Sequence, residues 1–167
     1  MPLIVEDGTG VAGANTYINA ADAVARAAVL GFNFPNESDA ETPLIRAAIY
    51  LEGKRLEYQG TKYISGQPLQ WPRDPVYIDN ELQQPSVIPQ LLIDAQVYIA
   101  SVDYSGGNLF ATSSGSATTK SVGDVSVTKT NAGELDNTAV MGFANDMLKP
   151  LMKGANYGLL EFPVCRA

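Results

Sequence analysis

Apolar residues recur at the spacing of an amphipathic helix in four stretches of the sequence, which predicts a mainly α-helical chain. Residues that favour the beginning or the end of a helix lie at the ends of three of these stretches. They are Asn19 and Gly31 for the first stretch, Pro89 at the start of the third, which runs to about Tyr104, and Asp136 or Asn137 and Gly154 for the last.

The second stretch has two possible starts. Ser38 and Glu41 have the spacing of a capping box, whereas Thr42 followed by Pro43 would place proline in the first helical position. From either start, apolar residues continue at helical spacing to about Tyr58.

A proline-rich segment, residues 61–89, separates the second and third helices. Proline fixes φ and has no N–H to donate, so its density here excludes long regular structure. The aromatic and aliphatic residues of the segment are too numerous for a solvated linker. We therefore expect an ordered connection that packs on the helices or on a neighbouring molecule.

The composition changes after residue 105. Residues 105–116 are rich in Gly, Ser and Thr, and residues 121–128 alternate between apolar and polar around Gly123 and Asp124. This alternation predicts a β-hairpin over about Thr118–Thr130, with Gly123 and Asp124 at its turn. Residues 155–167 are mostly apolar or aromatic, which is not the composition of a disordered end.

The length of 167 residues suits one domain. Its parts are an N-terminal arm (1–18), helices with the proline-rich connection (19–104), a loop with the hairpin (105–135), the last helix (136–154) and a C-terminal tail (155–167). The predicted fold is a four-helix bundle with a projecting β-hairpin and an extended tail.

The charge of the chain argues against stable DNA binding. It has 11 Lys and Arg against 18 Asp and Glu, a formal charge of −7, and its basic residues do not cluster. Nucleic-acid-binding proteins gather Lys and Arg against phosphates, whereas an acidic wall lets DNA slide past. No apolar run reaches the ~18 residues that cross a bilayer, and no signal-peptide pattern opens the sequence, so we expect a cytoplasmic protein without a membrane partner.

The sequence offers little for catalysis. It has no histidine, and Cys165 is its only cysteine, so the usual hydrolytic triads and an intrachain disulfide are excluded. Gly8, Gly10 and Gly13 resemble a phosphate loop only loosely, because no Gly-Lys-Ser/Thr follows, and a turn is the better interpretation. We expect no enzyme activity, no cofactor and no metal site.

Two features leave alternatives open. Trp71 either packs in the core, with Arg73 exposed or paired to a carboxylate, or one of the two anchors a subunit interface. Stacking of Trp71 on a nucleic-acid base is a third alternative, but it requires a basic groove. The tail either docks on its own domain or inserts into a partner. Its apolar candidates are Tyr157, Leu159, Leu160, Phe162 and Val164.

A resemblance to a known family is carried by two segments, Leu3-Ile4-Val5-Glu6-Asp7-Gly8-Thr9-Gly10 with Ala14-Asn15-Thr16-Tyr17, and Leu69-Gln70-Trp71-Pro72-Arg73. With these segments, and with the order of its predicted elements, the chain resembles the head-tail connector or adaptor (neck) proteins of tailed bacteriophages. Many of these carry the name DnaT-like single-stranded-DNA-binding protein.

The resemblance implies an adaptor-type fold and a structural protein of the virion neck, assembled in the host cytoplasm. It implies a dodecameric ring between the portal and the downstream neck or tail protein, through which genomic DNA passes without specific binding. The tail would dock on the portal, and Gly123 and Asp124 would face the channel or the next ring. The alternatives are a DnaT-like, single-stranded-DNA-binding replication protein and a stopper or tail-completion protein of the same neck.

Overall fold

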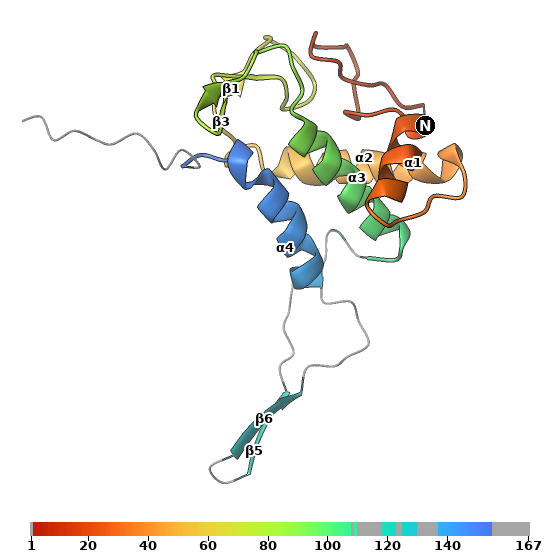
Figure 1. Cartoon of the computed structure of the whole chain (residues 1–167), viewed down its shortest axis with the longest axis vertical. Helices are drawn as coiled ribbons and strands as arrows, with labels where there is room; N and C mark the ends of the chain where they lie inside the picture. Colours follow the sequence, from red (N-terminus) through yellow and green to blue (C-terminus); the bar gives the residue numbers. More distant parts are fainter. Residues whose placement is uncertain (1, 108, 110–117, 123–124, 130–136, 155–167) are drawn as a thin grey trace, which may run out of the picture.

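The structure is a computed structural model that describes residues 2–107, 109, 118–122, 125–129 and 137–154 (Figure 1). Its helices are α1 (Ala20–Val29), α2 (Glu37–Gly53), α3 (Gln90–Tyr104) and α4 (Asn137–Leu148), and a 3-10 turn, η1 (Lys149–Leu151), follows α4. Its strands form three antiparallel pairs: β1 (Thr61–Lys62) with β2 (Arg73–Asp74), β3 (Tyr77–Ile78) with β4 (Glu81–Leu82), and β5 (Thr118–Val122) with β6 (Val125–Lys129). The described chain is thus mainly α-helical, as the sequence pattern predicts.

Helix α3 is the centre of the fold. It is apolar on nearly every side, and α1, α2 and α4 all pack against it (Figure 1). Because each fully buried Leu or Ile contributes about 1.5–3 kcal/mol, this helix supplies much of the hydrophobic stabilisation. Among the described helices α4 packs mainly on α3, so the contacts do not establish the four-helix bundle that the sequence predicted. The buried residues of α3 are Leu92, Ala95, Gln96, Val97, Ile99, Ala100, Ser101 and Val102.

The first helix begins where the sequence predicted. The Asn19 side chain accepts a hydrogen bond from the backbone N–H of Asp22 at 2.8 Å, which is the interaction of an N-cap. Gly31, just beyond the helix, has a φ of +84°, which glycine adopts without steric cost.

Both predicted starts of the second helix are wrong, and so is its end. Helix α2 begins at Glu37, after the extended residue Asn36, and acidic side chains in its first turn complement the helix dipole. Pro43 therefore lies inside the helix and not at its first position. The helix ends at Gly53, and the chain turns so that Tyr58 enters the core, where its hydroxyl donates to the carbonyl of Leu51 at 3.0 Å.

The proline-rich connection is ordered and contains only two-residue strands, as predicted. In the turn between β3 and β4, Asp79 and Asn80 have φ values of +52° and +66°. Positive φ at both central residues is the signature of a tight type I′ hairpin turn, which Asp and Asn tolerate. The pairing places Tyr77 directly opposite Leu82.

The second hairpin is also present. Strands β5 and β6 pair in register, with Val122 opposite Val125, and Figure 1 draws them apart from the helices. The predicted turn residues, Gly123 and Asp124, lie outside the described residues. The same holds for the tail, and therefore for Tyr157, Leu159, Leu160, Phe162 and Val164. Among the described helices, none is both long and apolar enough to cross a membrane.

Candidate functional site

The glycine-rich N-terminal loop binds a carboxylate of its own chain. Glu6 is buried, with 1 % of its surface exposed, and its Oε1 accepts hydrogen bonds from the N–H groups of Gly8 (2.9 Å) and Gly10 (2.8 Å). Gly8 lies so close to the proline-rich connection that a Cβ there would be 1.8 Å from the carbonyl oxygen of Ser86. The N–H groups that a phosphate would require are therefore already used, and the loop is a packing element.

Trp71 lies in the core. It is 1 % exposed, and its ring meets that of Tyr58 edge-on, with centroids 5.6 Å apart. This burial leaves no face of the indole open to a stacking base. The indole Nε1 is one of several buried side-chain atoms, among the described residues, that have no hydrogen-bond partner.

Contrary to the expectation from the sequence for a core Trp71, Arg73 is neither exposed nor paired with a carboxylate among the described residues. It is 8 % exposed, and its guanidinium donates to the carbonyl oxygens of Gln59 and Gly60, both at 2.7 Å, and to Oε1 of Gln70 at 3.0 Å. The burial lowers the pKa of Arg73. The fork of donors thus fixes the turn that precedes β1, a role that a compact ammonium group would fill poorly.

A buried polar network joins the two segments on which the resemblance depends. The hydroxyl of Tyr17 donates to Oε1 of Glu52 at 2.7 Å and accepts from the backbone N–H of Trp71 at 3.3 Å. The same Glu52 oxygen accepts from the N–H of Gln70 at 2.9 Å. Burial, reinforced by the nearby Glu52 carboxylate, raises the pKa of Tyr17 well above its ordinary value, so this hydroxyl is a donor and not a general base at neutral pH.

Gln96 makes a second set of buried hydrogen bonds, which was not predicted from the sequence. Its Oε1 accepts from the N–H of Tyr17 at 3.0 Å, and its Nε2 donates to Oγ1 of Thr16 and to the carbonyl of Leu44, at 2.9 and 3.0 Å. It therefore links the N-terminal arm to α2 and α3. A polar residue within the apolar stripe of the third helix was the available signal.

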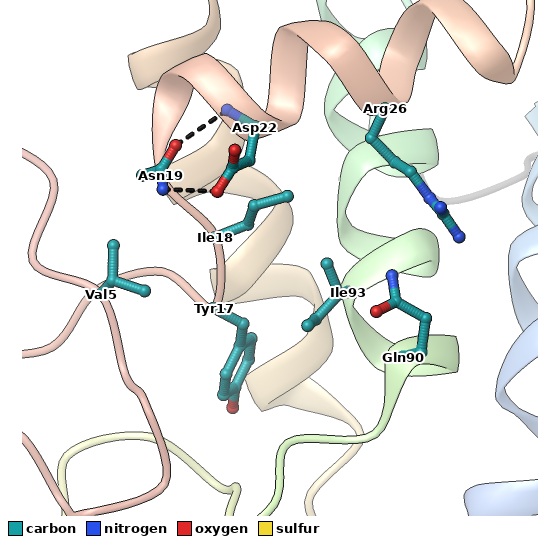
Figure 2. A pocket seen from close by; sticks show the side chains of 8 residues that line it. All are labelled: Val5, Tyr17, Ile18, Asn19, Asp22, Arg26, Gln90 and Ile93. Carbon is teal, nitrogen blue, oxygen red and sulfur yellow. Dashed lines mark hydrogen bonds between the residues drawn. The ribbon is translucent and has the colours of Figure 1, made fainter.

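A pocket of about 330 Å³ lies between the arm, α1 and the start of α3 (Figure 2). The polar groups around it are bound to each other: Arg26 makes a two-pronged ion pair with Asp94, at 2.7 and 2.6 Å, and Gln90 donates to the same carboxylate at 2.8 Å. Figure 2 shows Asn19 and Asp22 joined to each other at the other side of the pocket. These pairings leave little for a substrate to bind.

Most cations of the described residues are engaged within the chain. Ion pairs reduce the field that phosphates would experience, and a guanidinium buried against carbonyls cannot reach them. No group of three or more metal-ligating side chains occurs among the described residues. The cations with partners are Arg26 with Asp94, Arg46 with Asp103, Lys54 with Glu57, Lys149 with Asp146, and Lys62, Arg73 and Lys153 with backbone carbonyls.

The comparisons with known proteins give one match. A family model described as "Putative DnaT-like ssDNA binding protein" (DnaT_2) matches residues 1–167. Neither the curated proteins nor the solved structures contain a significant match. The description names single-stranded DNA binding, which is the alternative function expected from the sequence, and does not name a head-tail connector. Since the match extends over its whole length, the chain belongs to this DnaT-like family.

Proposed function

We propose that the chain is a structural head-tail adaptor of a tailed-phage virion, forming a dodecameric ring that joins the portal to the next neck or tail protein. The observation that carries the proposal is that the two segments of the resemblance meet in the fold. Tyr17 of the first segment binds the backbone of Trp71 in the second, and Glu52 binds both segments. They form a hydrogen-bonded packing unit rather than a reactive site, which supports a role in assembly.

The electrostatics support the same proposal. A ring that encloses DNA during ejection must not retain it, and the formal charge of −7 repels phosphates. Most of the described cations are paired with carboxylates or bound to backbone carbonyls. Genomic DNA would therefore pass without specific binding.

In this proposal the C-terminal tail attaches the ring to the portal, and the hairpin around Gly123 and Asp124 faces the channel or the next ring. The tail has the composition for such a contact, because Leu160 and Phe162 are large apolar residues close together. A stable contact would bury about 1,000 Å² or more. A stopper or tail-completion protein of the same neck is the structural alternative to the adaptor.

Native mass spectrometry of the chain mixed with the portal protein of the same genome tests this function. We expect portal complexes that gain a defined number of copies. Leu160→Asp with Phe162→Asp should abolish attachment, whereas Val29→Asp, at a residue that is 77 % exposed on α1, should not. Full attachment of the tail variant would refute the role of the tail, and no attachment of the unmodified chain would refute the adaptor itself.

Single-stranded DNA binding is the second candidate, because the family description names it. The described surface offers exposed aromatic residues for stacking, Tyr63 at 50 % and Tyr77 at 38 %. Lys62 precedes Tyr63 in the sequence, although its Nζ donates to the carbonyl of Gln67 at 2.9 Å. Trp71 cannot take part while it is buried. A DNA complex that weakens steeply with salt and is lost in Tyr63→Ala, without portal binding, would favour this candidate over the adaptor.

A further inference from the structure

The described chain ends at Gly154 beside a surface with exposed large apolar side chains. We call Leu56, Tyr77 and Leu82 the tail-exit surface; they are 77 %, 38 % and 58 % exposed. The backbone of Leu56 binds Lys153, near the end of the described chain, and Tyr77 and Leu82 lie on a hairpin that Gln59 joins to Pro150.

Hydrogen bonds hold the end of the described chain against this surface. The backbone N–H of Lys153 donates to the carbonyl of Glu57 at 2.7 Å, and its Nζ donates to the carbonyl of Leu56 at 2.9 Å. Tyr58 and Met152 form an antiparallel bridge. Residues 151–153 therefore run alongside residues 57–59, and the described chain ends close to Leu56.

Gln59 extends the same arrangement to the hairpin of β3 and β4. Its side-chain amide donates to the carbonyls of Pro150 (2.7 Å) and Tyr77 (3.1 Å) and accepts from the N–H of Tyr77 (3.1 Å). Figure 1 shows β3 beside the end of α4. The hairpin is thus fixed to the point where the tail leaves.

The hairpin presents its apolar pair outward. Tyr77 and Leu82 are directly opposite in the antiparallel pairing, so their side chains lie on one face. Ile78, the next residue, packs on the core cluster from the other face. An exposed aromatic-aliphatic pair held by a tight turn is a preformed contact surface.

We propose that, in the free protein, the tail-exit surface binds the chain's own C-terminal segment, residues 155–167. This segment is largely apolar, and it is attached directly to Gly154, whose φ of +82° suits a change of chain direction. An extended chain spans about 3.3 Å per residue, so this 13-residue segment has a reach of up to ~43 Å from Gly154. A short tether also gives an effective concentration of about millimolar, so even weak contacts are populated. The proposal does not depend on the proposed function.

The only cysteine, Cys165, lies in the tail and allows a direct test in the full chain. A nitroxide on Cys165 should accelerate relaxation of the amide signals of Tyr77 and Ile78 in a ¹⁵N-labelled sample. An undocked tether would also affect signals near Gly154, so variants provide the deciding comparison. Leu56→Asp with Leu82→Asp should reduce the effect at Tyr77 and Ile78 several-fold, whereas Val29→Asp, at a residue as exposed as Leu56, should leave it unchanged.

Two outcomes would overturn the proposal. The first is an effect of equal size in the wild type and in the double variant, which would mean that the tail does not bind this surface. The second is an effect that appears only between molecules, when unlabelled nitroxide-carrying protein is mixed with ¹⁵N-labelled protein whose Cys165 is blocked; the occupant would then be the tail of a second copy. Portal protein is absent from the sample, so failure here leaves the adaptor proposal intact.

Discussion

Replacing Trp71 by alanine should strongly destabilise the monomer. The indole is 1 % exposed and packs on Tyr58, so the change creates a cavity and removes an aromatic pair. Truncation of a buried Trp costs about 3–5 kcal/mol, and loss of the ring pair is part of that cost. Trp71→Phe should cost less, about 1–2 kcal/mol, because it leaves a smaller cavity and the indole Nε1 has no hydrogen bond to lose.

The assay is urea unfolding followed by far-ultraviolet circular dichroism, since Trp71 is the only tryptophan and its fluorescence disappears with it. A loss of 3–5 kcal/mol corresponds to a fall in melting temperature of roughly 6–20 °C for a chain of this size. Tyr63→Ala, at a residue that is 50 % exposed, is the control and should change stability by about 0.5 kcal/mol at most. An unchanged midpoint for Trp71→Ala, combined with loss of oligomers, would refute the core assignment and place Trp71 at a subunit interface.

Four further substitutions test other parts of the fold by the same unfolding measurement. Gly8→Ala should lower the free energy of unfolding by more than about 2 kcal/mol, and Gly31→Ala by about 1 kcal/mol. Both glycines have a positive φ, but only a Cβ at Gly8 would clash, with a backbone oxygen 1.8 Å away. Equal losses of stability would contradict the close packing of the arm. Arg73→Lys should cost about 2–4 kcal/mol, since one ammonium cannot replace three fork-like contacts, and a neutral effect would refute that role. Burial raises the pKa of Asp103 despite the opposing charge of Arg46, so the folded state binds this proton more tightly than the unfolded chain. The wild type should therefore gain stability relative to Asp103→Asn as the pH falls through the raised pKa towards 3.8, and the opposite slope would contradict the dominance of burial.

Local patterns predicted the parts of the fold that local interactions determine. Asn19 caps the first helix as expected, because its side chain and the N–H of Asp22 are close in sequence. The third helix ends at Tyr104 as predicted, and the hairpin pairs as its alternation indicates. In each case, the residues that decide the element lie within a few positions of one another.

Predictions failed where distant contacts decide the structure. The sequence pattern continues to Tyr58, yet α2 ends at Gly53 because Tyr58 packs against Trp71 in the core. Arg73 was expected to be exposed or paired, because nothing local reveals that the carbonyls of residues 59 and 60 converge on it.

If the tail both covers its own surface and docks on the portal, the two contacts must compete. The apparent dissociation constant for the portal then equals the intrinsic one divided by the fraction of molecules whose tail is free. A tail that is docked nine-tenths of the time would weaken portal binding about tenfold, and Leu56→Asp with Leu82→Asp should restore that factor. Titration of the portal with the double variant measures this change in the apparent dissociation constant. Val29→Asp is the control, because Val29 is as exposed as Leu56. Tighter binding of the double variant alone would connect the two proposals, because it shows that freeing the tail aids docking. Weaker binding would instead mean that the tail-exit surface itself contacts the portal.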